Sequence, residues 1–547
     1  MNLQKKKIFS FFNYESRNFS RAALVLVVST ILAKILALIR DRILAGLYGA
    51  SRNLDIYYTA FRIPDFLTNI LILGAISAAL IPVFADLWQK DKKKAWQLCN
   101  NLLCIFLFIL LILVIFAFIF APQIIKIIAP GFNEHDLNLT VGLTRIMFLS
   151  PIFLVVSSVF SSVLQYFSRF LVYSLAPVLY NLGIIIGAVF FTKLWGLYGL
   201  AVGVVLGALM HLLIQIPTAY LCGWRPQFIF NLKDKATKTV IKLTIPRTIG
   251  FSAQQINLIV ITAIASTFPS GSIAIFNLAN NLQAIPVSLF GISFATAVFP
   301  DLSRHVSLRN KEKFISSLKS SFSQILFLVF PISLLFFVFR AQIVRLILGS
   351  GVFGWVDTRL TAAVLGIFSF SIFAQSLVPL FSRAFHSLKD TKTPMIISIL
   401  TVIFNIILLF LFSWLFQFDW FGNFFIDFLK LKGINNVSVL SIPLAFLVSS
   451  VFNLILLEFA LEKKIPNKWP QEIAKSFWRI FLVSIFCSLI GYFALNLFGL
   501  ILNTRTFLGL FIQTALAGFV AILFYLGIAY FLNFPEFKEI KKGIFIN

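Results

Sequence analysis

Long apolar runs, each bounded by charged or turn-forming residues, recur along the whole chain. A helix needs about 20 apolar residues to cross a bilayer. The runs are continuous rather than alternating, which excludes a transmembrane β-barrel. The pattern therefore predicts an all-α polytopic membrane protein with fourteen transmembrane helices. The predicted spans are 22–46, 56–85, 99–121, 139–164, 170–192, 198–223, 243–267, 272–300, 317–339, 361–382, 394–414, 436–461, 476–499 and 507–532.

Composition supports this class of protein and excludes others. The chain has 547 residues, of which 59% are hydrophobic and 12% charged, whereas soluble domains carry about 25% charged residues. No GxxxxGK[ST] motif, C-x-x-C pair or Ser-His-Asp arrangement stands out, and the four histidines lack metal-ligand spacing. We therefore expect a transporter rather than an enzyme, with no catalytic residues, no metal site and no cofactor.

The formal charge of +26 follows the predicted topology. Of the 46 basic residues, 29 fall in the N-terminal segment and in the segments that follow even-numbered helices, 9 follow odd-numbered helices, and 8 lie within spans. Cytoplasmic loops of membrane proteins are enriched in Lys and Arg. The split predicts that both termini are cytoplasmic. It also predicts that the excess charge serves topology and attraction to anionic membrane lipids, not nucleic acid.

An internal repeat relates the two halves of the chain. Pro82 precedes Gln123-Ile-Ile-Lys-Ile-Ile by 41 residues, and Pro300 precedes Gln342-Ile-Val-Arg-Leu-Ile by 42. The offset spans six helices, so the copies share one orientation, which predicts a parallel repeat of two lobes around a central cleft. The predicted segments are a cytoplasmic N-terminal segment (1–21), the N-lobe (22–223), a cytoplasmic linker (224–242) and the C-lobe (243–461). They are followed by a cytoplasmic loop (462–475), helices 13 and 14 (476–532) and a cytoplasmic tail (533–547).

Ionisable residues interrupt the first two spans. Lys34, Arg40 and Asp41 lie in the first, and Asp55 and Arg62 lie at the start of the second. Such residues cost about 2.5–3.5 kcal/mol each on insertion scales, and they normally face a bundle interior or a wet cavity. The alternative interpretation is snorkelling near helix ends together with local ion pairs.

The second half carries basic and amide groups instead of carboxylates. Arg247 begins the seventh span, and Asn277, Asn280 and Asn281 lie in the eighth. The amides are equally typical of hydrogen bonding between membrane helices. A cleft lined by Lys34, Arg40 and Arg247 would nevertheless be net cationic and would suit a phosphate or pyrophosphate. A cation antiporter would need buried carboxylates.

Several blocks along nearly the whole chain carry a family resemblance. They include Arg40-Asp41-Arg-Ile-Leu-Ala, Asp55-Ile-Tyr-Tyr-Thr-Ala-Phe-Arg-Ile-Pro64, Phe290-Gly-Ile-Ser-Phe-Ala-Thr-Ala-Val-Phe-Pro300 and Asp390-Thr-Lys-Thr-Pro394. These blocks resemble the MurJ/MviN family of the MOP exporter superfamily. The resemblance implies fourteen helices in two lobes, with the last two helices forming a groove for a lipid tail. It also implies flipping of lipid II, the undecaprenyl-pyrophosphate-linked peptidoglycan precursor, across the bacterial cytoplasmic membrane.

The family's cavity residues transfer only in part. Lys34 stands at the family's helix 1 basic position, Arg40 and Asp41 at its Arg-Asp pair, and Asp55 at its helix 2 aspartate. Two family arginines fall on Thr68 and Asn281. We hypothesise that Arg247 supplies charge to the pyrophosphate in their place. The expected substrate-binding set is thus Lys34, Arg40, Asp41, Asp55, Arg62, Arg247 and Asn281, without the sodium site of some relatives.

Other functions stay open from the sequence. A flippase for lipid-linked O-antigen or exopolysaccharide repeats would also use a cationic cleft, and the two missing arginines favour it. A multidrug or cation antiporter of the same superfamily is disfavoured by the missing carboxylates. A non-transporting scaffold that recruits cell-wall enzymes would need no charges within the membrane. We expect a monomer whose partners are lipid II, membrane lipids and the cell-wall synthesis machinery.

Overall fold

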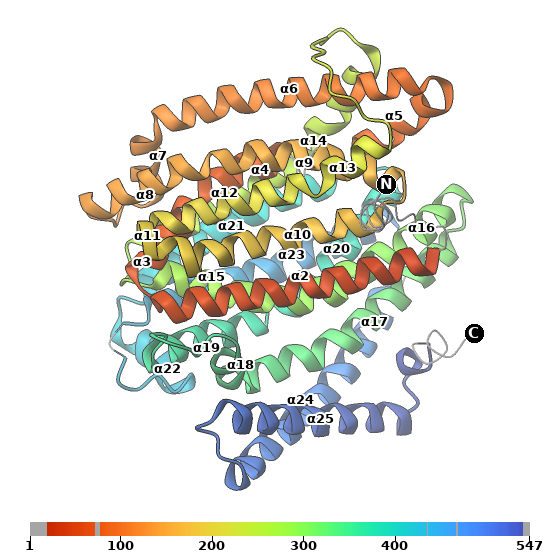
Figure 1. The fold of residues 1–547 in the computed structure, drawn as a ribbon. Coiled ribbons are helices and arrows are strands. Elements are labelled where there is room, and N and C mark those ends of the chain that lie inside the picture. The colour runs from red at the N-terminus through yellow and green to blue at the C-terminus, as the bar shows by residue number, and fades with distance from the viewer. Residues whose placement is uncertain (1–18, 72–76, 435, 466–468, 540–547) are drawn as a thin grey trace, which may run out of the picture. The chain divides into compact units, whose positions relative to one another are not determined.

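All regular structure in the described part of the chain is helical (Figure 1). The computed structural model describes residues 19–71, 77–434, 436–465 and 469–539. In those stretches ten helical spans are long and apolar enough to cross a membrane, or eleven if one pair bent by 44° counts as a span. The prediction of a multi-pass helical membrane protein is confirmed. The full count of fourteen stays a prediction for the first, second and seventh spans. These spans contain charged residues that lower their mean hydropathy, or they include residues outside the described part of the chain.

The chain divides into two compact units, Met1–Ile273 and Ala274–Asn547. The first unit contains α2 (Phe19–Tyr48), α3 (Arg52–Ala60), α4 (Arg62–Leu71), α5 (Ser77–Lys90), α6 (Lys92–Ile119), α7 (Ala121–Ile128), α8 (Glu134–Met147), α9 (Leu149–Tyr166), α10 (Phe170–Ile186), the π-turn η2 (Gly187–Phe191), α11 (Thr192–Trp195), α12 (Tyr198–Leu213), α13 (Gln215–Leu221) and α14 (Lys235–Ser266). Helix α14, the predicted seventh span, packs on α4, α5 and α7 of this unit. The predicted lobe boundary at residue 243 stays a prediction.

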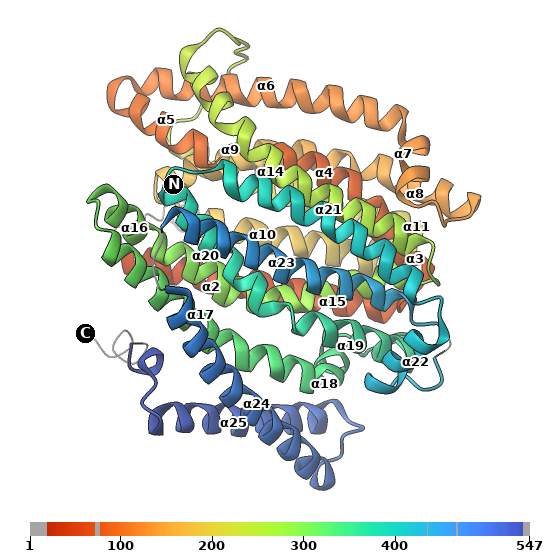
Figure 2. The same ribbon diagram turned by 180° about the vertical axis from the view of Figure 1, so that it is seen from behind.

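The second unit holds the remaining elements, and α15 begins at the boundary. They are α15 (Ser272–Pro286), the π-turn η3 (Val287–Ile292), α16 (Ser293–Ser307), α17 (Lys311–Val338), α18 (Arg340–Ile347), α19 (Trp355–Ser369), α20 (Ile372–Ser387), α21 (Lys392–Leu415), α22 (Asp419–Phe428), the 3₁₀ turn η4 (Ser438–Leu440), α23 (Ser441–Lys464), α24 (Trp469–Ile501) and α25 (Phe507–Phe531). Within this unit α24 packs on both α17 and α25 (Figure 2).

The sequence repeat corresponds to a repeated structural element. Helices α6 and α17 are both 28 residues long, and each is followed by a helix of 8 residues, α7 or α18. Each long helix begins at a side-chain cap: Asp91 accepts from the backbone N–H groups of Lys93 and Lys94, and Asn310 accepts from that of Lys313. The two halves therefore repeat helix lengths and start signals as well as sequence.

Glycines bring α10 and α12 into close contact. A Cβ on Gly183 would lie 2.3 Å from the Cα of Gly207, and one on Gly187 would lie 2.4 Å from the Cα of Gly203. Small residues allow the backbones of membrane helices to approach in this way. Because α10 also packs on α2, this seam sets the position of the α10 side chains that face α2.

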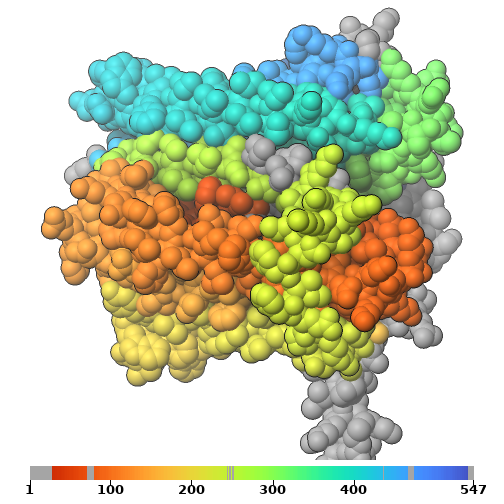
Figure 3. Space-filling view, turned by 90° about the horizontal axis from the view of Figure 1, so that it is seen from above, coloured from red at the N-terminus to blue at the C-terminus, as the bar shows by residue number. Residues whose placement is uncertain are grey.

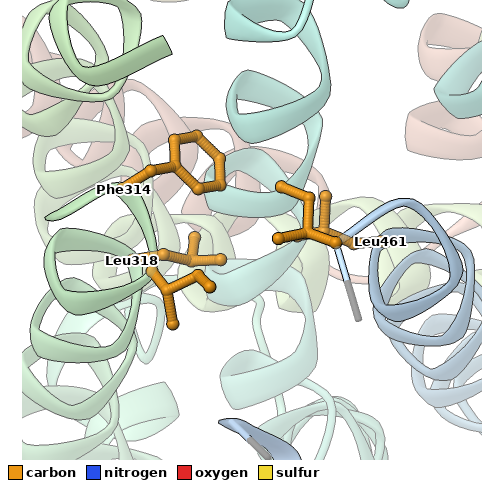
Figure 4. A pocket seen from close by; sticks show the side chains of 5 residues that line it. Phe314, Leu318 and Leu461 are labelled. Carbon is orange, nitrogen blue, oxygen red and sulfur yellow. The ribbon is translucent and has the colours of Figure 1, made fainter. Parts of the chain in front are cut away.

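Aromatic and aliphatic side chains fill the second unit. The Tyr525 hydroxyl donates to the Phe327 carbonyl at 2.8 Å, which ties α25 to α17. At the ends of α17 and α23, Phe314 and Leu318 face Leu461 across a small apolar pocket (Figure 4). Its volume of about 10 Å³ leaves room for no more than a water molecule, so it is a packing defect rather than a substrate site.

Candidate intramembrane binding site

Arg40 lies at the centre of a hydrogen-bonded cluster in the first unit. Its Nε and Nη2 donate to Asp41 Oδ1 at 3.0 and 2.7 Å, and its Nη1 donates to Asn181 Oδ1 at 3.0 Å. The Asp41 carboxylate is buried, whereas the Arg40 side chain is 20% exposed. A buried carboxylate needs a charge partner and hydrogen bonds to compensate its desolvation. Arg40 supplies both, and its guanidinium is held in one orientation with part of its surface open.

Asn181 of α10 was missed from the sequence as a site residue. Its amide nitrogen donates to the Pro177 carbonyl at 3.0 Å, which turns its oxygen toward Arg40. The available signal was a polar amide inside the otherwise apolar span 170–192. Position alone could not name its partner, which lies 141 residues away along the chain.

Arg62 joins α4 to α14. Its Nε donates to Thr262 Oγ1 at 2.8 Å, and that hydroxyl donates to the Leu258 carbonyl at 2.8 Å. Asp65, one helical turn after Arg62, interacts electrostatically with both Arg62 and Arg40. The predicted residues Arg40, Asp41 and Arg62 therefore share one polar region of the first unit, to which the structure adds Asn181 and Asp65.

Lys34 differs from Arg40 in having no partner in the part of the chain that the structure describes. It lies six residues earlier on α2, about 9 Å along the helix axis, and is half-buried. Among the residues that the structure describes, its ammonium makes neither a hydrogen bond nor an ion pair. A half-buried cation without an internal partner is available to an anionic ligand.

Asp55 belongs to a separate cluster at the ends of α3, α8 and α14, which we call the latch. Its side chain is 1% exposed and accepts from the backbone N–H of Gly271 at 2.6 Å. Arg52 bridges two carboxylates: its Nη1 lies 3.9 Å from Asp55 Oδ2, and its Nε lies 3.5 Å from Asp136 Oδ2. Nearby, the Gly131 N–H donates to Ser266 Oγ at 3.1 Å. Asp55 therefore fastens backbone segments together rather than lining the Arg40 cluster.

The remaining predicted residues are placed less completely. The Thr68 hydroxyl is buried and donates to the Pro64 carbonyl at 2.7 Å, so this position offers no charge. Arg247 lies in α14, but its side chain lies outside the described residues. Asn281 lies on α15 in the second unit, and its part in a site with Lys34 stays a prediction. No group of three or more His, Cys, Asp or Glu side chains in the described stretches is arranged to hold a metal ion.

An apolar groove runs along α25 in the second unit. Its volume is about 430 Å³, within the range of ligand sites. The lining residues are Ile332, Leu335, Phe336, Phe339, Ile343, Thr514, Ala515, Gly518, Phe519 and Ile522. The sequence resemblance implied a groove formed by the last two helices. The observed groove uses the last helix, α25, with α17 and α18 as its other wall.

Comparison with known proteins bears on this arrangement. The sequence profile of the family described as "Lipid II flippase MurJ" matches residues 44–514. The "Probable lipid II flippase MurJ" of Buchnera aphidicola subsp. Schizaphis graminum is 29% identical over 512 residues, covering 88% of this chain and 97% of the relative. The "Lipid II flippase MurJ" of Burkholderia cenocepacia is 28% identical over 393 residues, covering 70% and 76%.

Solved structures share the fold. The structure titled "Lipid II flippase MurJ, inward closed conformation" aligns with a TM-score of 0.74 and 23% identity, covering 93% of this chain and 99% of that chain. An inward-facing multidrug resistance MATE transporter of the MOP superfamily aligns with a TM-score of 0.63 and 14% identity, covering 83% and 99%. Since the family profile spans most of the sequence, the chain belongs to the family described as lipid II flippase MurJ.

Proposed function

We propose that this chain flips lipid II, an undecaprenyl-pyrophosphate-linked peptidoglycan precursor, across the bacterial cytoplasmic membrane by alternating access. Family membership supplies the substrate class. The observation that carries the proposal at residue level is that α2 holds both a constrained Arg40 and, six residues earlier, a half-buried Lys34 that has no hydrogen-bond or ion-pair partner among the described residues. Arg40 supplies a guanidinium held in one orientation and Lys34 supplies an ammonium, the two groups with which proteins bind phosphate oxygens.

The charge balance of the polar region supports an anionic ligand. Arg40 and Arg62 in this region, with Lys34 six residues before Arg40 on α2, contribute three positive charges against the carboxylates of Asp41 and Asp65. A net positive region within the membrane is costly when it is empty. A pyrophosphate would offset that cost, whereas a cationic drug would increase it, so the antiporter alternative is not favoured.

The apolar groove along α25 suits the other end of such a substrate. Its lining is aliphatic and aromatic apart from Thr514, and it has enough volume for several isoprene units. We propose that the polyprenyl tail occupies this groove. The protein would then work as a monomer with both termini in the cytoplasm, as the loop charges predict.

The latch supports an alternating mechanism. It joins the end of α14 to α3 and α8 through Asp55, Arg52 and two backbone N–H groups. We propose that the latch closes the extracellular end of the substrate path when lipid II enters from the cytoplasmic leaflet. Its opening would release the head group on the other side.

Complementation in a bacterium depleted of its own lipid II flippase tests the function. The wild-type chain should restore growth, and Lys34→Ala should not, at equal membrane abundance. Rescue of a strain lacking an O-antigen or exopolysaccharide flippase, without rescue of the lipid II strain, would favour the polysaccharide alternative. Full activity of Lys34→Ala, Arg40→Ala and Asp41→Ala would favour a non-transporting scaffold.

The same assay tests the role proposed for Arg247. If Arg247 contributes charge to the pyrophosphate, Arg247→Ala should lower rescue and Arg247→Lys should retain most of it. Unchanged flipping by Arg247→Ala, alongside loss in Lys34→Ala, would show that the first-helix cations act without it.

A further inference from the structure

The segment joining α13 to α14 exposes large apolar side chains. We call residues 225–233 the linker loop. Phe228 is 89% exposed, and Phe230 and Leu232 are exposed as well. The sequence predicted a cytoplasmic linker here. Three exposed apolar side chains within five residues are unfavourable in water and mark a surface that contacts something apolar.

Two buried asparagines hold the linker loop against α6. The Asn101 side chain donates to the Asn231 carbonyl at 2.8 Å and accepts from the Asn231 N–H at 2.7 Å. The Asn100 amide donates to the Arg225 carbonyl at 2.9 Å. Figure 3 shows the yellow-green loop crossing the orange surface of α5 and α6. Because non-helical backbone needs polar partners at membrane depth, these amides allow the loop to enter an apolar region.

The contacts lie well along α6, beyond its charged start. Lys94 is the last cation of this helix, and Asn101 follows it by seven residues, about 10 Å along the axis. The ring of Phe230 contacts that of Phe108 at a centroid distance of 5.3 Å, about 21 Å beyond Lys94. Phe108 belongs to the exposed apolar face of a membrane-spanning helix. The linker loop thus continues a surface that faces lipid.

Cations flank the apolar residues at both ends of the loop. Arg225 precedes them, stacked over the Tyr220 ring at 4.3 Å, and Lys233 and Lys235 follow. Long basic side chains place their charge at the level of the headgroups while neighbouring apolar groups lie deeper. Aromatic residues between basic ones are typical of segments bound to an anionic bilayer surface.

We propose that the linker loop is inserted into the bilayer, with Phe228 among the acyl chains and Arg225, Lys233 and Lys235 at anionic headgroups. The leaflet would be the cytoplasmic one, which follows the proposed orientation. The insertion itself does not depend on the substrate. It makes the loop a membrane anchor placed directly before α14.

Collision measurements on a spin label test the insertion. The full chain, with Cys99, Cys104, Cys222 and Cys487 replaced by serine or alanine, would carry Phe228→Cys and be reconstituted into vesicles of phosphatidylglycerol and phosphatidylcholine. The matched controls are Phe116→Cys, on the lipid-facing side of α6, and Lys313→Cys, on an exposed helix start.

The label at position 228 should collide with dissolved oxygen in preference to a water-soluble nickel chelate, as the label at 116 does. A nickel preference like that at 313 would place the loop in water and overturn the proposal. A label shielded from both reagents would also overturn it, since Phe228 would then be covered by protein.

Discussion

The carboxylate of Asp55 binds the backbone N–H of Gly271 at 2.6 Å, although 216 residues separate them in the chain. The family resemblance placed Asp55 among the residues that bind substrate. In this conformation the carboxylate accepts the Gly271 N–H and has Arg52 as a second neighbour, and a substrate contact at Asp55 stays a prediction. The hydrogen bond from Gly271 to Asp55 is therefore a mark of the closed latch. A substitution at Gly271 tests the latch and leaves the side chains of the Arg40 cluster unchanged.

Gly271→Ala should open or destabilise the latch. Gly271 has a φ of +91°, and an added Cβ would lie 1.9 Å from the Ala50 carbonyl oxygen. The unfavourable backbone alone costs about 1–3 kcal/mol. We expect a lower midpoint of thermal unfolding in detergent and reduced rescue of the depletion strain. Gly422→Ala is the control, because a Cβ there meets nothing within 4 Å. Equal midpoints for the two variants would contradict a tightly closed latch.

Arg40→Lys should abolish most transport despite keeping the charge. Arg40 reaches Asp41 and Asn181 from three separate nitrogens of a planar guanidinium, whereas a lysine carries its three N–H donors on one nitrogen and cannot reproduce that geometry. Asn181→Ala should cause a smaller loss, since it removes one hydrogen bond to a charged group, worth about 1.5–3 kcal/mol.

Asn496→Ala is the matched control for Asn181→Ala. Both asparagines donate to the carbonyl four residues earlier, but only Asn181 also accepts from Arg40. Rescue of the depletion strain, normalised to membrane abundance, measures the transport of both asparagine variants.

Transport by Arg40→Lys at the wild-type rate would show that orientation of the guanidinium is unimportant.

Gly518→Trp should block the apolar groove. Gly518 lines it, and a Cβ there lies 3.6 Å from the Phe339 ring, so an indole would fill the space proposed for the polyprenyl tail. Gly527→Trp on the same helix is the control, because a Cβ at that position meets nothing within 4 Å. We expect at least a tenfold loss of lipid II flipping in proteoliposomes for the first variant only. Equal activity of both would exclude the groove from the substrate path.

The Asp390–Lys464 ion pair should make stability depend on acid pH. Burial raises the pKa of Asp390, but hydrogen bonds from Lys464 and Thr393 outweigh it and lower the pKa to about 2. An unfolded aspartate has a pKa of about 3.9. The pair therefore stabilises the fold above pH ~4, and this contribution is lost as the pH falls toward 2.

Asp390→Asn should remove that pH dependence. Between pH 4 and 2 the thermal midpoint of the wild type should fall more than that of the variant. Asp427→Asn is the control, since Asp427 pairs with Lys432 at 3.7 Å on an exposed surface where ion pairs contribute little. Parallel pH profiles for the wild type and Asp390→Asn would refute the assignment.

The helical architecture was predictable because membrane spans follow directly from length and hydropathy. The repeat was also predictable, and its structural basis is the matched pairs α6–α7 and α17–α18. Helices α7 and α18 lie almost entirely between predicted spans. Each helix has eight residues with Lys126 or Arg345 in its last turn and is too short for a span, so hydropathy alone gives no reason to place a helix there.

For each contact in the candidate site, only one of the two interacting residues was predictable from the sequence. Charges in an apolar helix identified Arg40 and Asp41, because few other reasons keep charges in a membrane. Asn181, the partner of Arg40, lies on α10, and the packing of α10 on α2 is a tertiary feature. The partner of Asp55 is a backbone N–H, and every residue except proline has one, so no side-chain pattern reveals it.

Lipid II flipping by Lys34→Gln and Lys34→Arg variants in proteoliposomes tests the central claim most directly. If the cation at position 34 binds the pyrophosphate, Lys34→Arg should flip at a rate near that of the wild type, and Lys34→Gln should lose at least tenfold at equal reconstitution. Flipping by Lys34→Gln at the wild-type rate would contradict the account, because a half-buried cation that has no partner among the described residues would then have no part in binding the substrate.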